Sequence, residues 1–159
     1  MNSNTALIEK FYSAFQQKDF RAMQQCYHDD VLFSDPVFPL LRGKQAKAMW
    51  HMLVSGGKDL GLIYSQVQAG DKDGSCHWEA TYTFSVTGRK VRNIIDAQFE
   101  FKDGKIIRHA DQFNLWKWSR MALGPSGTFL GWSPLVKNKI RRLAAGNLQK
   151  FIDAHQEYQ

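Results

Sequence analysis

The chain has 159 residues, of which 43% are hydrophobic and 13% aromatic, so it is long enough to bury the core of one ordinary domain. The first residues show no basic segment before an apolar run, and no stretch approaches the roughly 18 apolar residues of a membrane span. We therefore expect neither a secretory signal nor a membrane-spanning helix, and we predict a single cytoplasmic domain over residues 1–159.

The formal charge of +6 is carried almost entirely by the C-terminal segment. Residues 1–116 hold 14 Lys and Arg against 13 Asp and Glu, which leaves 7 against 2, or +5, for residues 117–159. These basic residues are not interleaved with aromatic side chains as they are in modules that bind single-stranded nucleic acid. We therefore expect no nucleic-acid partner.

The N-terminal third is expected to be mostly helical. Apolar residues recur at helical spacing from Leu7 to Phe15, and Asp19 suits the N-cap of a second short helix that includes Tyr27. Residues 31–35 are typical of a strand that Pro36 stops, and a third helix with Ala46, Met49, Trp50 and Leu53 on one stripe follows Gly43.

From Leu62 onward the apolar residues alternate with period two. Turn signals divide this part into strands at about 62–70, 75–86, 91–102 and 105–118, and an antiparallel meander connects them most simply. Helices before such strands predict an α+β fold, in which helices cover one face of a curved sheet and leave a concavity.

The segment from 119 to 159 extends beyond this core domain. Ser133-Pro134 is typical of an N-cap followed by proline at the first helical position, so a last helix should run to about Gln156. Its apolar residues approximate one stripe (Val136, Ile140, Leu143, Leu148, Phe151 and Ile152), while most Lys and Arg lie elsewhere. We expect a packed helix with a solvated basic face; contact with a membrane surface is the alternative.

Asp35 is the first candidate for chemistry. Strand alternation places Val31, Phe33 and Asp35 on one face, which should point inward. Alternatively, Asp35-Pro36 simply begins a turn, because an aspartate side chain bonds readily to the backbone that follows it.

Asp96 and Asp111 form the second candidate constellation. If Asp103-Gly104 closes a two-residue hairpin loop, Asp96 lies directly opposite Asp111, and one of the two should keep a proton because adjacent charges repel. A three-residue loop with a bulge would turn the two acids to opposite faces instead. The remaining alternative is that both are solvated acids of a half-exposed sheet.

His109, close to Asp111 in sequence, is either a satisfied polar residue of the sheet or a proton carrier. The other histidines and the two cysteines, Cys26 and Cys76, show no metal-ligand spacing, and neither a phosphate loop nor a serine elbow is present. We therefore expect no metal and no cofactor, and we expect both thiols to be structural.

Two segments resemble the ketosteroid isomerase and SnoaL-like polyketide cyclase superfamily, which has a nuclear transport factor 2-like fold. Residues 27–38 resemble the segment that carries the isomerase's general base, and residues 94–106 resemble the strand and hairpin that carry its protonated oxyanion-hole Asp. The resemblance spans roughly residues 5–116. It implies a cone-shaped α+β domain around an apolar pocket, with Asp35 as the base and Asp96 as the neutral hydrogen-bond donor.

Phe11 stands where the isomerase has its tyrosine donor, and its neighbour Tyr12 would point elsewhere on the helix. Asp111 has no acidic counterpart in the isomerase, whereas SnoaL-like cyclases and limonene epoxide hydrolase relatives place acids in this sheet. The resemblance therefore leaves open three functions. These are proton transfer on a small apolar carbonyl substrate, epoxide hydrolysis through Asp96 or Asp111, and a non-catalytic ligand-binding or dimerisation module.

We predict a pocket for a small hydrophobic molecule, into which Asp35 and Asp96 both open, with walls formed by Phe11, Tyr12, Phe33, Trp50 and Phe113. The resemblance also implies a homodimer. It would form through the exposed sheet face, since the even-numbered aromatic residues of 76–86 need cover on one side or the other.

Overall fold

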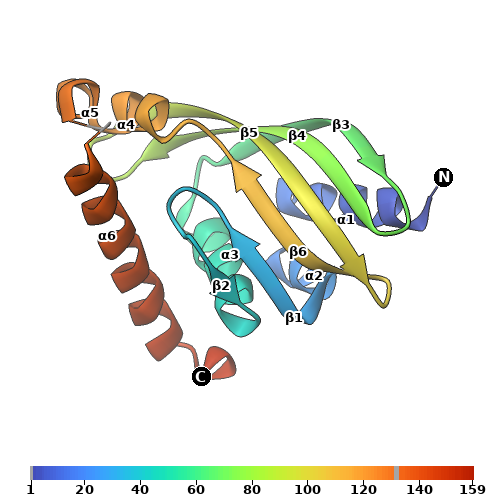
Figure 1. Cartoon of the computed structure of the whole chain (residues 1–159). Coiled ribbons are helices and arrows are strands. Elements are labelled where there is room, and N and C mark those ends of the chain that lie inside the picture. Colours follow the sequence, from blue (N-terminus) through green and yellow to red (C-terminus); the bar gives the residue numbers. More distant parts are fainter. Residues whose placement is uncertain (1, 131–132) are drawn as a thin grey trace.

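The computed structural model describes residues 2–130 and 133–159. In chain order its elements are α1 (Ser3–Gln16), α2 (Phe20–Gln25), β1 (Tyr27–Ser34), β2 (Leu41–Arg42), α3 (Lys44–Gly56), β3 (Gly61–Ala69), β4 (Asp73–Phe84), β5 (Arg89–Lys102), β6 (Lys105–Gln112), α4 (Leu115–Leu123), α5 (Pro125–Leu130), α6 (Pro134–Asp153) and the 3-10 turn η1 (Gln156–Tyr158). Figure 1 shows the curved sheet with α1 and α3 on one side and α6 beyond α3.

The six strands form one sheet in the order β2-β1-β6-β5-β4-β3. Strands β3 to β6 pair as an antiparallel meander, whereas β1 runs parallel to β6. The α+β fold with helices on a curved sheet is confirmed, as is the meander.

Period-two patterning decides which face of the meander is inside. In β4 the even-numbered Cys76, Trp78 and Ala80 are buried, and in β5 the odd-numbered positions from Val91 to Phe99 are buried. The aromatic residues of β4 are thus covered by helices of the same chain. Association of two copies through the outer face stays a prediction, which the mass of the protein in solution at micromolar concentration tests.

The strand that begins at Lys105 is shorter than its sequence pattern suggests. It ends at Gln112, and the expected continuation to residue 118 is wrong. Asn114 caps α4, its Oδ1 accepting a hydrogen bond from the backbone N–H of Lys117 at 3.0 Å, and Leu115 and Trp118 are then buried at helical spacing. The helices α4 and α5 were not anticipated.

Tyr27 also lies outside its expected element, because it begins β1 and is not part of α2. The short helix is capped as expected, with Asp19 accepting a hydrogen bond from the N–H of Ala22. Gly43 has a φ of 50° before α3, and a side chain there would meet the Asp29 carbonyl at 2.9 Å, so the position requires glycine.

The predicted C-terminal helix is present, capped by Ser133, and it ends at Asp153, three residues earlier than expected. Leu148 and Ile152 are buried, whereas Leu143, which the sequence pattern placed on the same apolar stripe, is 60% exposed. Among the residues described, no helix is long and apolar enough to span a membrane.

Candidate functional site

One small cavity lies between the inner face of the sheet, α3 and α4, with a volume of about 180 Å³. Most of its wall is apolar and aromatic, and Asp35 and Asp111 are its only ionisable carboxyl groups among the lining residues that the structure describes. The lining residues are Phe15, Asp35, Val37, Phe38, Met49, Trp50, Leu53, Leu60, Trp78, Ala80, Tyr82, Asn93, Ile95, Asp111, Phe113 and Trp118.

Asp35 follows the last residue of β1 and both begins a turn and reaches the cavity, so the two interpretations of this residue hold together. Its Oδ1 accepts hydrogen bonds from the backbone N–H groups of Val37 at 2.7 Å and Phe38 at 2.6 Å. Burial raises the pKa of Asp35 to about 6; the bond from Phe38 opposes this rise, and the nearby charge of Asp111 adds to it.

Asp111, on β6, is held by a buried chain of polar side chains. Its Oδ1 lies 2.8 Å from His109 Nε2 and accepts a longer bond, 3.4 Å, from Trp78 Nε1. On the far side of the ring, His109 Nδ1 lies 2.7 Å from the Tyr27 hydroxyl, which itself accepts a hydrogen bond from Trp50 Nε1 at 2.7 Å. The cavity carboxyl is thus connected to the core through four side chains.

The donors and acceptors of this chain determine where the His109 proton lies. Burial raises the pKa of Tyr27 well above its ordinary value, so its hydroxyl keeps a proton, while its oxygen accepts from Trp50. If that proton is donated to Nδ1, the imidazole proton must be on Nε2, where it points at Asp111. This arrangement gives every side-chain N–H and O–H group in the hydrogen-bonded series an acceptor, as buried polar groups require.

The second oxygen of each cavity carboxyl group is unpartnered among the described residues and keeps some exposed surface. Asp111 Oδ2 and Asp35 Oδ2 have no hydrogen-bond partner among the described residues. Neither atom is fully buried, because Tyr12 Oη is the one fully buried side-chain oxygen without a partner in this part of the chain. Each acid therefore uses one oxygen for positioning and presents the other.

Asp96 does not lie in the cavity, and its predicted place there is wrong. The Asp103-Gly104 loop does have two residues, with Lys102 opposite Lys105, but the register shifts between Glu100 and Phe101. Across that shift, Ile107 is an extra residue in β6, which inverts the alternation beyond it.

The bulge places Ala97 opposite Asp111, and Gln112 opposite Asp96. The expected face-to-face pair of Asp96 and Asp111 is therefore also wrong. The Asp96 side chain is 71% exposed on the outer face, where its Oδ1 lies 2.8 Å from His77 Nδ1. An exposed carboxylate beside a histidine cannot serve as a neutral donor inside the cavity.

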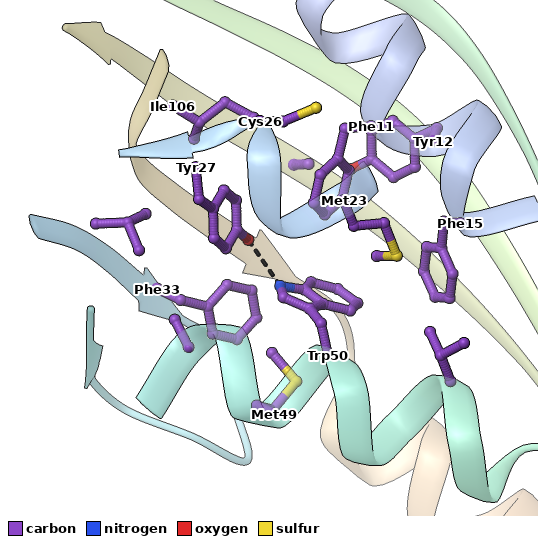
Figure 2. Packing of buried hydrophobic residues seen from close by; sticks show 14 of the residues in the cluster. Phe11, Tyr12, Phe15, Met23, Cys26, Tyr27, Phe33, Met49, Trp50 and Ile106 are labelled. Carbon is purple, nitrogen blue, oxygen red and sulfur yellow. Dashed lines mark hydrogen bonds between the residues drawn. The ribbon is translucent and has the colours of Figure 1, made fainter. Parts of the chain in front are cut away.

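The aromatic residues predicted as walls divide into two groups. Trp50 and Phe113 line the cavity, whereas Phe11, Tyr12 and Phe33 are buried in the core and are not among the lining residues. Figure 2 shows Phe11 and Phe33 beside the hydrogen-bonded pair of Trp50 and Tyr27.

Phe11 and Phe33 also pack edge-on against His109, with ring centroids 5.5 and 5.1 Å away. These two rings shield the histidine from water and do not line the cavity.

Sequence reasoning missed the polar groups that β4, β5 and α4 bring to the cavity. Trp118 Nε1 donates to the Tyr82 hydroxyl at 2.6 Å, which leaves the hydroxyl proton of Tyr82 available, and Asn93 lies nearby on β5. The alternation of β4 places Trp78 and Tyr82 on the same face of the strand. Trp118 could not be placed, because its segment was expected to be a strand.

No three His, Cys, Asp or Glu residues gather at metal-binding distances anywhere in residues 2–130 or 133–159. The two cysteines are free, and burial raises the pKa of Cys76 to about 12, so its thiol stays protonated and unreactive.

Comparison with known proteins places the fold. A protein provisionally named a polyketide cyclase, from Xanthomonas campestris, superposes with a TM-score of 0.65 at 22% identity over 75% of this chain and 96% of its own. A Mycobacterium tuberculosis LEH-like epoxide hydrolase gives a TM-score of 0.61 at 17% identity over 76% and 90%. A provisionally named ketosteroid isomerase from Kribbella flavida gives a TM-score of 0.57 at 16% identity over 70% and 78%.

At these identities the superpositions establish the fold alone, and no curated protein matches the sequence. The sequence model of the SnoaL-like domain matches residues 8–109, which run from within α1 into β6 and include every cavity-lining residue except Asp111, Phe113 and Trp118. The chain belongs to the SnoaL-like domain family.

Proposed function

We propose that this protein is an acid–base enzyme that moves a proton on a small, largely apolar carbonyl compound held in the cavity. The observation that carries the proposal is that Asp35 and Asp111 both reach one aromatic cavity, with one oxygen of each left free. Carbonyl chemistry of this kind fits the polyketide cyclase and ketosteroid isomerase names among the structural neighbours.

Asp35 is the base in this proposal. A pKa of about 6 lies close to neutral pH, which is where a general base both exists in its charged form and keeps the strength to accept a proton. The two backbone N–H groups that hold Oδ1 fix the carboxylate, so that Oδ2 is positioned to take a proton from the carbon next to the substrate carbonyl.

Asp111 takes the hydrogen-bonding role that the sequence had suggested for Asp96. Two charges in one apolar cavity repel, so in the reactive form that we assign one acid is charged and the other holds a proton. In this form Asp35 is the charged acid and Asp111 holds the proton. Because Asp111 Oδ1 accepts from His109 and Trp78, that proton sits on Oδ2 and can be donated to the developing enolate oxygen.

The reaction then balances in two steps. The C–H bond breaks, its proton moves to Asp35, and the electron pair moves onto the carbonyl oxygen against the Asp111 hydroxyl. The enolate next either regains the proton from Asp35 at another carbon, which is an isomerisation, or attacks an electrophilic carbon of the same molecule, which closes a ring. Tyr27 supports both outcomes as a positioning residue, since it keeps the His109 proton on Nε2.

Epoxide opening is a second candidate, favoured by the raised pKa of Asp35. Here the roles reverse: Asp111 removes a proton from water, and protonated Asp35 donates to the epoxide oxygen. An LEH-like epoxide hydrolase is among the structural neighbours.

The test is a substrate screen with enones, polyketide-like esters and epoxides, using three variants. Asp35→Asn and Asp111→Asn should each lower kcat/KM by about 10²- to 10⁴-fold, the usual contribution of a general acid or base. Asp96→Asn makes the same change on the outer face and should leave kcat/KM within about twofold, as ordinary surface substitutions do. Binding without turnover, equal in the wild type and all three variants, would identify a non-catalytic module.

The pH profile separates the two reactions. If Asp35 is the base, kcat/KM rises as the pH rises through about 6, because the charged form is the active one. If Asp35 is the acid of an epoxide hydrolase, kcat/KM falls over the same interval.

A further inference from the structure

A second concave surface, the basic groove, lies on the other side of β5 from the cavity. It is defined by Arg89, Arg92, Lys117 and Arg120 together with Ile94 and Met121, and its volume is about 780 Å³. Strand β5 contributes Arg92 and Ile94 to the groove, while the alternating Asn93 and Ile95 face the cavity. The groove and the cavity are therefore separate sites that share one strand and helix α4.

The basic groove concentrates charge of one sign. Four cationic side chains line it, and none of the lining residues in the described part of the chain is acidic. One neighbouring acid, Glu79, contacts Arg92 at 2.9 Å, so most of the positive charge stays uncompensated. Like charges held together raise the local potential and cost energy that a bound anion would offset.

Three of the cations are held in place by their surroundings. Arg89 Nε donates to the Met121 carbonyl at 2.9 Å, the Arg120 guanidinium lies 4.8 Å from the Trp116 ring centre, and Arg92 is held by Glu79. Each contact leaves other N–H groups of the guanidinium free. Guanidinium groups fixed in this way match the oxygens of a carboxylate or phosphate and lose little entropy on binding.

The groove also offers an apolar contact that an inorganic ion would not use. Ile94 is 50% exposed on the outer face of β5, and Met121 of α4 lines the same groove. A volume of about 780 Å³ lies within the ~300–1,000 Å³ range of small-molecule sites. The site therefore suits a ligand with an anionic head and an apolar body.

We propose that the basic groove binds an elongated organic anion, with a carboxylate or phosphate held by the arginines and an apolar chain placed over Ile94 and Met121. This site is independent of the proposed catalytic function, because it shares no lining residue with the cavity.

Isothermal titration with octyl phosphate and with octanoate tests the proposal and identifies the preferred head group. The triple variant Arg89→Gln/Arg92→Gln/Arg120→Gln should weaken the affinity at least tenfold. The matched control Lys139→Gln/Arg142→Gln/Lys150→Gln removes the same charge from exposed positions of α6 and should change the affinity less than twofold. Affinity for the wild type should fall as salt is added.

Further probes separate the alternatives. Inorganic phosphate and octyl glucoside supply the head and the chain alone, and each should bind at least tenfold more weakly than octyl phosphate. Asp35→Asn should leave octyl phosphate binding unchanged, since Asp35 lies in the cavity. The proposal is overturned by no binding at millimolar concentration, by equal loss in the α6 control, or by equal binding of octyl glucoside.

Discussion

Two His–Asp pairs lie on opposite faces of the same sheet, and the distance between the histidine nitrogen and the aspartate oxygen is the same in both pairs. His109 Nε2 and Asp111 Oδ1 are 2.8 Å apart on the inner face, and His77 Nδ1 and Asp96 Oδ1 are 2.8 Å apart on the outer face. The inner side chains are 0% and 3% exposed, whereas the outer ones are 25% and 71% exposed.

Equal geometry therefore has unequal consequences. Water screens the outer pair, so it behaves as a surface ion pair in which the Asp96 carboxylate raises the pKa of His77. This pair contributes to stability at low pH and loses that contribution as the pH rises through the raised pKa of His77. The inner pair is buried, so water cannot readily replace a missing partner, and the pair matters for both stability and the proposed chemistry.

The largest contrast should appear when each histidine is removed. His109→Ala removes one hydrogen-bond partner from Asp111 and one from Tyr27 and opens a hole among aromatic rings, so the free energy of unfolding should fall by about 3–5 kcal/mol. His77→Ala should cost no more than about 1 kcal/mol, as expected for an exposed pair. Urea denaturation of both variants measures the difference, and equal losses would contradict the contrast drawn between the two faces.

The next effect is the loss of folding stability that results from burying the charge of Asp35. The folded state raises the pKa of Asp35 from 3.8 to about 6, so the folded protein binds more protons than the unfolded chain between these values. Stability must then fall as the pH rises from about 4 to 6, by an amount that approaches at most about 3 kcal/mol above pH 6.

Asp35→Asn keeps an oxygen for the two backbone N–H groups and removes the charge. The variant should therefore be more stable than the wild type at pH 7.5 by about 2 kcal/mol and equally stable near pH 4. Denaturation curves at the two pH values test this, with Asp96→Asn as the control. If the variant is less stable than the wild type at pH 7.5, the charge of Asp35 does not destabilise the folded protein.

A smaller effect should follow from cutting the inner chain one residue further from the cavity. Tyr27→Phe leaves Trp50 Nε1 and His109 Nδ1 without their partner, which should lower the free energy of unfolding by about 1–2 kcal/mol. The more specific readout is the position of the His109 ring proton. Nitrogen-15 NMR should find this proton on Nε2 in the wild type, and it should find a mixture of the Nδ1–H and Nε2–H tautomers in the variant.

Trp50→Phe provides the control for this change, because it spares the Tyr27–His109 contact and should leave the proton on Nε2. The same tautomer in Tyr27→Phe as in the wild type would remove the positioning role of Tyr27.

The smallest effect should be a gain in stability. Tyr12 is fully buried, and its hydroxyl is the one buried side-chain oxygen without a hydrogen-bond partner within residues 2–130 and 133–159. Tyr12→Phe removes that unsatisfied group and keeps the ring, which stacks on Tyr64 at 5.4 Å. We expect a rise of about 1 kcal/mol in the free energy of unfolding, measured by urea denaturation. A loss would indicate a partner for the hydroxyl, such as buried water.

Local sequence patterns determined most of the fold. Alternation in residues 76–86 separated the two faces of β4, Asp19 and Ser133 capped the helices that follow them, and Asp103-Gly104 closed the expected two-residue loop. The place of Asp35 on the inward face also followed from alternation along β1. These features depend on neighbours in sequence, so the sequence alone contains them.

Only the tertiary structure decided which acids share the cavity. The extra residue Ile107 in β6 inverts the alternation, so Asp111 turns inward with His109 while Asp96 stays outside on β5. Likewise, Tyr27 and Trp118 reach the site only because β1 pairs beside β6 and α4 folds back along β5. A bulge or a helix that folds back forms through pairing and packing between segments distant in the chain, and no local pattern encodes it.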